Sequence, residues 1–276
     1  MRIDSHQHFW LYEPTKDAWI TPEMQAIAKN FLPNDISGEL KKHRIDGVVA
    51  VQADQSQRET DFLLELSSVY ALIKGVVGWI DLRSAHIDEL LARYTDQTVI
   101  KGFRHIVEAE VSPDFMIDDA FFRGLEAIQR GGYSFDLLVS PSHYQATLRC
   151  VRAYPEMRFV LDHMAKPRIG QGRDRVWEQF IEDLAAYPHV YCKVSGLITE
   201  ADWSGWTAKE FIPYFQHVVH CFGWERLMYG SDWPVCVLAS DYQGVINLAA
   251  YLLDQVSPND QAAFWGETAT AFYRLK

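Results

Sequence analysis

Two kinds of hydrophobic pattern alternate along the chain. Short runs of almost uninterrupted apolar residues, such as Gly47 to Ala53, are typical of parallel strands buried on both faces. Longer segments such as residues 57–70, where apolar side chains recur every three or four positions, predict amphipathic helices. Strands are expected at residues 3–8, 47–53, 73–81, 99–106, 134–139, 158–163, 190–195 and 227–231. Helices are expected at residues 34–44, 57–70, 87–94, 121–128, 144–154, 177–184, 211–222, 245–253 and 261–273, the first capped by Asn34 or Asp35.

This alternation of strands and helices predicts the fold class. A doubly wound sheet that binds a dinucleotide carries G-x-G-x-x-G after its first strand, and this sequence does not. The length of 276 residues suits one barrel better than two ordinary domains, because such a barrel takes about 250 residues. We therefore expect an α/β protein with a (β/α)8 TIM barrel as a single domain over residues 1–276. The active site should lie at the C-terminal ends of the strands.

Charge and composition narrow the class of partner. A net charge of −11 argues against binding to nucleic acid or an anionic membrane, since both require a basic face. No apolar run approaches the roughly 18 residues of a membrane span, and the first ten residues lack the regions of a signal peptide. The four cysteines are far apart and are read as ordinary thiols. We expect a cytoplasmic protein that acts on a small molecule, with no oligomeric state predicted.

The first candidate chemistry is a pair of histidines at the end of the first strand. His6 and His8 are two positions apart, so in an extended strand they point to the same side. Asp232 follows the last apolar run, and in a closed barrel that run lies beside the first strand, which makes Asp232 face the pair. Two imidazoles and a carboxylate can bind a metal ion or act in proton transfer. The alternatives are a structural histidine pair and an aspartate that only caps a turn.

Two more polar side chains stand at predicted strand ends. A lone histidine such as His163 is often a hydrogen-bonded core residue, but its position near the others favours a role in the site. Arg104 would be costly to bury, which suggests an anionic or oxyanion partner. The alternative for Arg104 is a salt bridge to Glu108 or Glu110.

Further polar and aromatic residues at the same strand ends are candidates for substrate contact. We expect such contacts from Gln52, Trp79, His105, Lys166 and Trp233. Lys193 is a weaker candidate, because a lysine at a strand end is often only solvated. Aromatic side chains in such places are also often no more than packing.

Five segments in order along nearly the whole chain resemble the amidohydrolase superfamily. They read D-S-H-Q-H-F-W from residue 4, K-G-F-R-H from 101, L-D-H-M-A-K-P from 161, K-V-S-G-L-I-T-E-A-D-W from 193 and M-Y-G-S-D-W-P from 228. The resemblance is to the lactonase branch, which includes L-fuconolactonase, L-rhamnonolactonase, 4-sulfomuconolactone hydrolase and 2-pyrone-4,6-dicarboxylate lactonase.

The resemblance implies roles for these residues. His6 and His8 would be the first-strand metal pair, His163 the sixth-strand histidine, Arg104 a substrate-binding arginine and Asp232 the general base. Members of the superfamily with a firmly held metal usually add a lysine or glutamate from strand four or a histidine from strand five. Residues 135–138 of the fifth strand offer no histidine. We therefore expect a divalent metal ion, zinc, that is weakly held or dispensable.

The candidate metal ligands are His6, His8, His163 and Asp232. Four protein ligands would close the tetrahedral shell of zinc and leave no place for water. We therefore expect that either Asp232 swings between metal and water or His163 stays off the ion and contacts the substrate. The resulting expectation is substoichiometric metal and activity that partly survives chelation.

The predicted function is a hydrolase that opens a sugar-acid lactone such as L-fucono- or L-rhamnono-lactone. Asp232 would deprotonate the attacking water, while Arg104 and His163 stabilise the oxyanion. One alternative is a hydrolase of dicarboxylate lactones or a related decarboxylase, whose anionic substrates would need several cationic side chains. Another is a non-catalytic sugar-binding barrel, which would not need to keep the histidines and Asp232 together.

Overall fold

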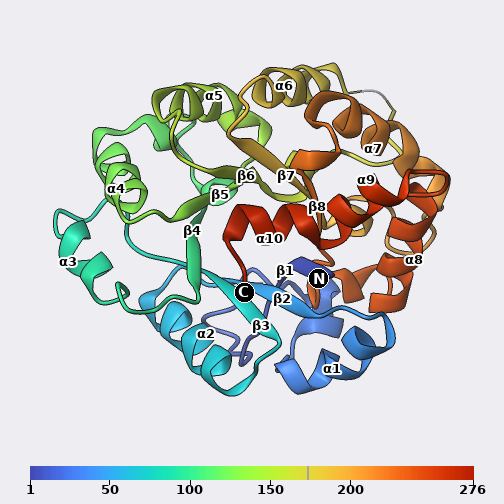
Figure 1. Cartoon of the computed structure of the whole chain (residues 1–276), viewed down its shortest axis with the longest axis horizontal. Helices are drawn as coiled ribbons and strands as arrows, with labels where there is room; N and C mark the ends of the chain where they lie inside the picture. The colour runs from blue at the N-terminus through green and yellow to red at the C-terminus, as the bar shows by residue number, and fades with distance from the viewer. Residues whose placement is uncertain (173) are drawn as a thin grey trace.

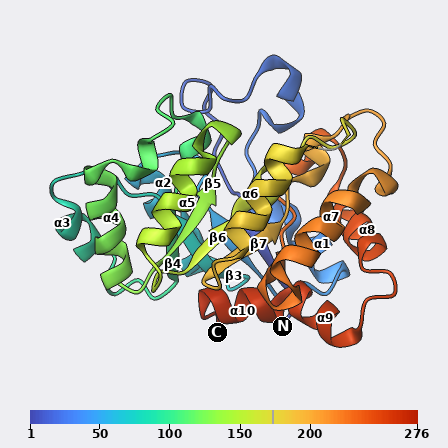
Figure 2. The same ribbon diagram turned by 90° about the horizontal axis from the view of Figure 1, so that it is seen from above.

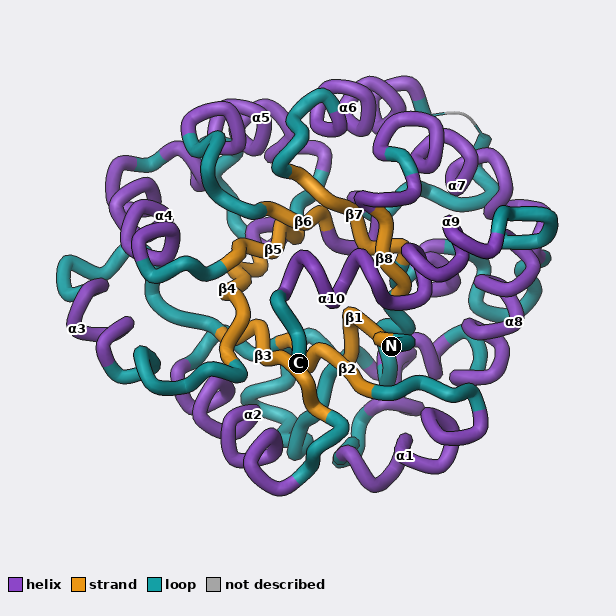
Figure 3. Tube along the Cα trace, in the orientation of Figure 1, coloured by secondary structure: helices purple, strands orange, loops and turns teal. Residues whose placement is uncertain are grey.

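Eight parallel strands form a ring at the centre of the protein, and helices surround it (Figure 1). The structure is a computed structural model, and it describes residues 1–172 and 174–276. The strands pair in sequence order from β1 to β8, and Figure 3 shows them as a continuous inner layer. They are β1 Ile3–Gln7, β2 Gly47–Val51, β3 Ile73–Gly78, β4 Ile100–Ile106, β5 Ser134–Leu138, β6 Phe159–Leu161, β7 Val190–Val194 and β8 Leu227–Tyr229. The predicted (β/α)8 barrel is confirmed.

The helices follow the predicted apolar periodicity, with differences at their ends. They are α1 Pro33–Lys42, α2 Gln57–Val69, α3 Ile87–Ala92, α4 Asp119–Arg130, α5 Tyr144–Ala153, α6 Arg175–Ala185, α7 Ala208–Phe222, α8 Tyr242–Leu252, α9 Pro258–Ala262 and α10 Thr268–Tyr273. The predicted helix 261–273 is wrong as a single helix, because Gly266 has a non-helical backbone and interrupts it. The predicted cap of α1 is wrong, because the helix begins at Pro33 and the Asp35 carboxylate accepts the backbone N–H of Leu32 at 2.7 Å. Every helix of the described chain is too short or too polar to cross a membrane.

The barrel closes between β1 and the residues that follow β8. The His8 N–H donates to the Trp233 carbonyl at 2.7 Å, and the Asp232 N–H donates to the His6 carbonyl at 2.9 Å. The buried Asp4 carboxylate accepts the Ser231 N–H at 2.9 Å and strengthens the same junction. Closure therefore places Asp232 directly beside the strand that carries the two histidines.

The two ends of the barrel are covered by different segments. Figure 2 shows α10 and both chain termini at one end, and the segment that follows β1 at the other. At the first end Phe272 and Tyr273 of α10 pack with Ile3 and Met228 in an apolar cluster that closes the barrel. The segment at the second end contributes Trp10 to a cavity that also contains Asp232. This second end is therefore the mouth of the barrel.

Glu59 of α2 gives a prediction about stability. Its side chain is buried and accepts the Ala53 N–H at 3.1 Å, and burial raises its pKa from 4.5 to about 7. The folded protein therefore binds more protons than the unfolded chain between these pH values, so this carboxyl lowers stability as pH rises through that window. We expect Glu59→Gln to raise the free energy of unfolding at pH 8 by about 1–3 kcal/mol, and to change it little at pH 4.5.

Urea denaturation at the two pH values measures this effect. Glu65→Gln, at an exposed position of the same helix, is the matched control and should be neutral at both. An equal gain at pH 4.5 and pH 8 from Glu59→Gln would show that the carboxylate charge is not the cause.

Candidate active site

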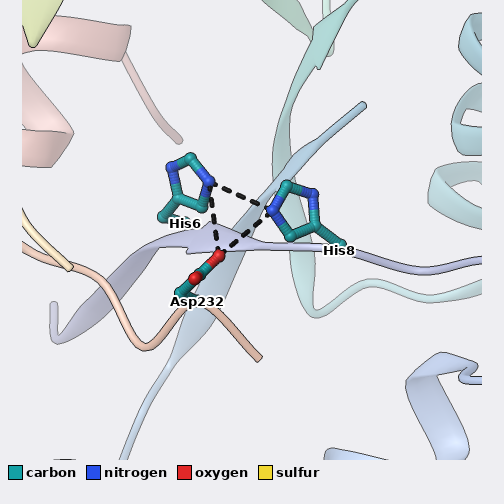
Figure 4. A group of neighbouring side chains, drawn as sticks. All are labelled: His6, His8 and Asp232. Carbon is teal, nitrogen blue, oxygen red and sulfur yellow. Dashed lines mark hydrogen bonds and ion pairs between the residues drawn. The ribbon is translucent and has the colours of Figure 1, made fainter. Parts of the chain in front are cut away.

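The two histidines of β1 converge as their spacing predicts. His6 Nε2 lies 3.2 Å from His8 Nε2, and both side chains are buried (Figure 4). His8 Nδ1 donates to the Val51 carbonyl at 2.8 Å. His8 Nε2 is therefore the ring nitrogen that faces His6.

Asp232 joins the pair from the loop after β8. Its Oδ1 lies 3.2 Å from His8 Nε2 and 3.8 Å from His6 Nε2 (Figure 4). Burial would raise the pKa of Asp232, but the neighbouring His163, His8 and His6 hold it below its ordinary value. The carboxylate is therefore ionised at neutral pH. Its backbone is left-handed, with φ at 59°, a conformation that costs non-glycine residues energy and is concentrated at functional sites.

The separations within this cluster fit a metal ion. Two atoms bound to one tetrahedral zinc ion are roughly 3.3–3.4 Å apart, given bonds of about 2.0–2.1 Å. The three ligand atoms of His6, His8 and Asp232 are 3.2, 3.2 and 3.8 Å apart. They are mutually close enough to hold one ion, whereas His163 groups instead with His6 and Asp162. Three ligands would leave one tetrahedral position for water or substrate.

His163 reaches the cluster from a turn, not from a strand. The predicted strand 158–163 is too long, since β6 ends at Leu161 and the four residues from His163 to Lys166 are all left-handed. The Trp177 indole N–H holds this turn by donating to the Met164 carbonyl at 2.7 Å. His163 Nδ1 lies 2.9 Å from Ser195 Oγ. Burial lowers the pKa of His163, so the ring is neutral at pH 7.

Arg104 has buried partners that the sequence did not indicate. Its Nη1 lies 3.0 Å from Asp162 Oδ2 and 3.4 Å from His6 Nε2, and its Nη2 lies 3.2 Å from Gln52 Oε1. Within the described chain, the alternative salt bridge to Glu108 or Glu110 is not formed. Those carboxylates pair with other residues, as Glu108 lies 2.6 Å from Lys166 Nζ and Glu110 lies 2.7 Å from His105 Nε2.

A cavity of about 370 Å³ opens directly onto the cluster. Its wall combines five candidate site residues with aromatic, aliphatic and acidic side chains. It is lined by His8, Trp10, Trp19, Met24, Ala53, Arg104, Ile106, Glu108, Leu138, His163, Lys166, Gly196, Thr199, Glu200, Trp203, Asp232, Val235 and Leu238. This size and this mixture of apolar surface with few polar groups suit a small organic molecule.

The other predicted contact residues stand behind this wall. Trp79 donates its indole N–H to His105 at 3.3 Å, and His105 stacks on Phe115 with the rings 4.7 Å apart. Trp233 packs edge-on against Phe31 at 5.3 Å. The Gln52 side chain contacts Arg104, as described above. Of the five predicted substrate contacts, only Lys166 is among the described lining residues, and the substrate-binding roles of all five remain predictions.

The structure adds a buried charged group around Lys193, which the sequence marked only as a weaker candidate, and Glu200, which was not predicted. Lys193 is fully buried, and its Nζ lies 2.5 Å from Asp136 Oδ2 and 3.0 Å from Asp162 Oδ1. Glu200 lines the cavity. A signal for the group around Lys193 was present, because three adjacent predicted strands carry the complementary charges of Asp136, Asp162 and Lys193 in apolar runs. No comparable signal marked Glu200.

Gly196 lies against two of the candidate catalytic side chains, His163 and Asp232. Its φ is 64°, and a Cβ at this position would lie 2.6 Å from His163 Nδ1 and 3.2 Å from Asp232 Oδ2. We expect Gly196→Ala to displace these groups and to lower turnover by about 10–100-fold, because misplacement of catalytic groups by about 1 Å has effects of this size. Gly170→Ala is the matched control, since Gly170 also has a positive φ of 76° but nothing within 4 Å of its added Cβ. If turnover falls by the same factor in both variants, the cause is backbone strain and not crowding of the site.

Comparison with known proteins identifies the family. Residues 3–275 match the family described as Amidohydrolase. The L-fucono-1,5-lactonase of Burkholderia multivorans is 38% identical over 294 aligned residues, which cover 100% of this chain and 96% of that protein. The L-fucono-1,5-lactonase of Burkholderia ambifaria is 34% identical, with 99% and 96% covered. A crystal structure of an amidohydrolase from Burkholderia multivorans with bound zinc superposes with a TM-score of 0.96 at 36% identity, over 100% of both chains. The chain therefore belongs to the amidohydrolase family, within its lactonase branch.

Proposed function

We propose that this protein is a hydrolase that opens a sugar-acid lactone of the L-fucono-lactone type. The observation that carries the proposal is the ionised Asp232 carboxylate, which lies beside two histidines and lines a cavity of small-molecule size. The full-length similarity to two L-fucono-1,5-lactonases supports the same reaction and substrate class.

In the proposed reaction Asp232 accepts a proton from water as the water oxygen bonds to the lactone carbonyl carbon. The carbonyl electron pair moves onto its oxygen and forms a tetrahedral oxyanion. When the carbonyl re-forms, the bond to the ring oxygen breaks, and Asp232 returns its proton to that oxygen, which leaves as a hydroxyl group. The new carboxylic acid then releases its proton to solvent.

The oxyanion would be stabilised by groups that already line the cavity. Ser195 can donate its hydroxyl proton to His163 Nδ1, which leaves the Nε2–H of His163 as a donor. Arg104 adds a fixed positive charge at the cavity wall. The Burkholderia multivorans structure contains zinc. A zinc ion held here by His6, His8 and Asp232 would polarise the carbonyl and acidify bound water.

The charges of the wall favour a neutral lactone over a dicarboxylate lactone. Both cationic side chains of the described wall are already paired, Arg104 with Asp162 and Lys166 with Glu108. Glu200 adds a further carboxyl group. An extra substrate carboxylate would therefore meet no unpaired cation, whereas carboxylates accept hydrogen bonds from sugar hydroxyls. For this reason the dicarboxylate lactone remains the second candidate.

Steady-state kinetics on two kinds of lactone tests the proposal. Neutral aldonolactones, including L-fucono-1,5-lactone, are expected to be turned over with kcat/KM at least a hundredfold above that for pyrone dicarboxylates and muconolactones. A preference for the dianions would favour the second candidate. Tight binding of aldonolactones without turnover would indicate a sugar-binding barrel instead.

Glu200 gives a prediction about inhibition by the acid product. Burial raises the pKa of Glu200 to about 7. The side chain is therefore largely neutral at pH 6 and ionised at pH 8, where it repels an anion in the cavity. We expect the inhibition constant of the aldonate product to rise several-fold between these pH values. Glu200→Gln should remove this dependence and leave the turnover of the neutral lactone close to wild type. If the inhibition constant still depends on pH in Glu200→Gln, another group is the cause of that dependence.

A further inference from the structure

Another cavity, of about 210 Å³, lies at the closed end of the barrel, opposite the mouth. Its lining includes Thr98, which precedes β4, Gly132, which precedes β5, and Arg158, which precedes β6. These residues meet because β4, β5 and β6 are adjacent parallel strands, which start at the same edge of the sheet. Arg274 joins them from the end of α10, the helix at this end of the barrel (Figure 2). The cavity is therefore separate from the candidate active site.

Three cationic side chains line this cavity, namely Lys101, Arg158 and Arg274. The Arg158 guanidinium donates to the Gly132 carbonyl at 2.7 Å. Lys101 Nζ donates to the Thr98 carbonyl at 2.7 Å and lies 3.4 Å from the Arg274 carbonyl. Arg274 Nη1 would lie 3.9 Å from a Cβ added to Gly132. These contacts bring the three side chains together at one place.

In the described part of the chain, the positive charges of this cluster have no carboxylate partner. The hydrogen bonds of Lys101 and Arg158 are with backbone carbonyls, and the Arg274 guanidinium donates to no described group. Carbonyls carry only partial negative charge, so they fix the cations without neutralising them. Burial lowers the pKa of Lys101, and the positive charges around it lower it further. The cations therefore repel one another, and a bound anion would relieve that repulsion.

The remaining donors match a phosphate group. A guanidinium presents pairs of N–H donors whose spacing fits two oxygens of a phosphate. No described residue occupies the donors of Arg274, and Arg158 uses only part of its five. Thr95 and Thr98 line the same cavity and can offer hydroxyl groups to an organic part of a ligand. The cavity is larger than a single phosphate group, so it leaves room for such a part.

We propose that this cavity binds a small phosphate monoester, with its phosphate group held by Lys101, Arg158 and Arg274. The net charge of the chain is −11, so the protein as a whole repels such a ligand and binding depends on this local cluster. The inference goes beyond lactone hydrolysis and is independent of it, because it concerns the opposite end of the barrel.

Isothermal titration calorimetry at constant ionic strength tests the proposal with two probes, inorganic phosphate and glycerol 3-phosphate. Both are expected to bind the wild-type protein saturably, and the ester more tightly, because the cavity has room for its glycerol part. Glycerol alone lacks the phosphate group and should not bind. The absence of saturable binding of both probes would overturn the inference. Equal or weaker binding of the ester would overturn the assignment to a monoester.

Arg274→Gln locates the binding site. It removes a guanidinium that has no partner in the described chain, and it keeps the backbone contact of residue 274 with Lys101, so the fold should be unchanged. The affinity for both probes is expected to fall about tenfold or more, as for the loss of a charge-assisted hydrogen bond. Arg123→Gln, at an exposed position of α4 outside this cavity, is the matched control and should bind like wild type. Equal affinity in wild type and Arg274→Gln would place the bound anion elsewhere, for example at the mouth, and would overturn the inference.

Discussion

Asp232→Asn is expected to lower kcat by about 10³-fold, within the range of about 10²–10⁴ for loss of a general base. The amide has nearly the same shape as the carboxylate but cannot accept the proton of the attacking water. The barrel should still close, because the hydrogen bond from residue 232 to His6 is made by the backbone N–H. Initial rates on a neutral aldonolactone, with circular dichroism to verify folding, measure the loss.

Asp241→Asn serves as the control for this variant. Asp241 caps α8 by accepting the Gly244 N–H, and asparagine caps helices about equally well. It lies outside the described cavity wall, so its activity should equal that of wild type. Should Asp232→Asn keep more than a tenth of the wild-type kcat, Asp232 is not the base and another group must activate the water.

His163→Asn is expected to lower kcat by about 10²–10³-fold, as does removal of one oxyanion donor in other hydrolases. Asparagine tolerates the left-handed backbone of this position, where φ is 53°. Its amide reaches about as far as Nδ1 of the histidine and so can keep the contact with Ser195, while the donor at Nε2 is lost. The variant therefore tests the Nε2–H donor, which would contact the substrate, separately from the contact of the ring with Ser195.

The separate changes in kcat and KM show how His163 acts. A donor used mainly in the transition state lowers kcat with only a small change in KM. A higher KM with unchanged kcat would instead mean that His163 only binds the lactone. Ser195→Ala should show a milder loss of kcat, because it frees the ring without removing it.

The apolar pattern was sufficient to predict the barrel, but not the turn that carries His163. Each strand needs a continuous apolar run, and each helix needs one apolar face, so their alternation is visible in the residue order. The turn from His163 to Lys166 contains four non-glycine residues with positive φ. Intrinsic preferences disfavour that conformation, and only tertiary contacts such as Trp177 with the Met164 carbonyl hold it. Sequence rules therefore extended the strand too far.

Part of the site was predictable for a geometric reason. The i, i+2 spacing of His6 and His8 and the closure of the barrel beside Asp232 are consequences of strand geometry and topology alone. Lys193 was underestimated, because a lysine is buried only when specific partners compensate it. Those partners come from elsewhere in the barrel, Asp136 from β5 and Asp162 from the turn after β6. Strand-end position also does not reveal whether a side chain reaches the cavity, as His105 illustrates.

The most direct test of the proposed hydrolase is proton release in a pH-stat. Freshly prepared L-fucono-1,5-lactone is mixed with wild-type protein whose zinc content has been measured, and Asp232→Asn is the blank for spontaneous ring opening. We expect one proton to be released per lactone, at a rate that far exceeds the blank and scales with protein concentration. A wild-type rate equal to that of the Asp232→Asn blank, for this lactone and for other neutral aldonolactones, would contradict the proposed function.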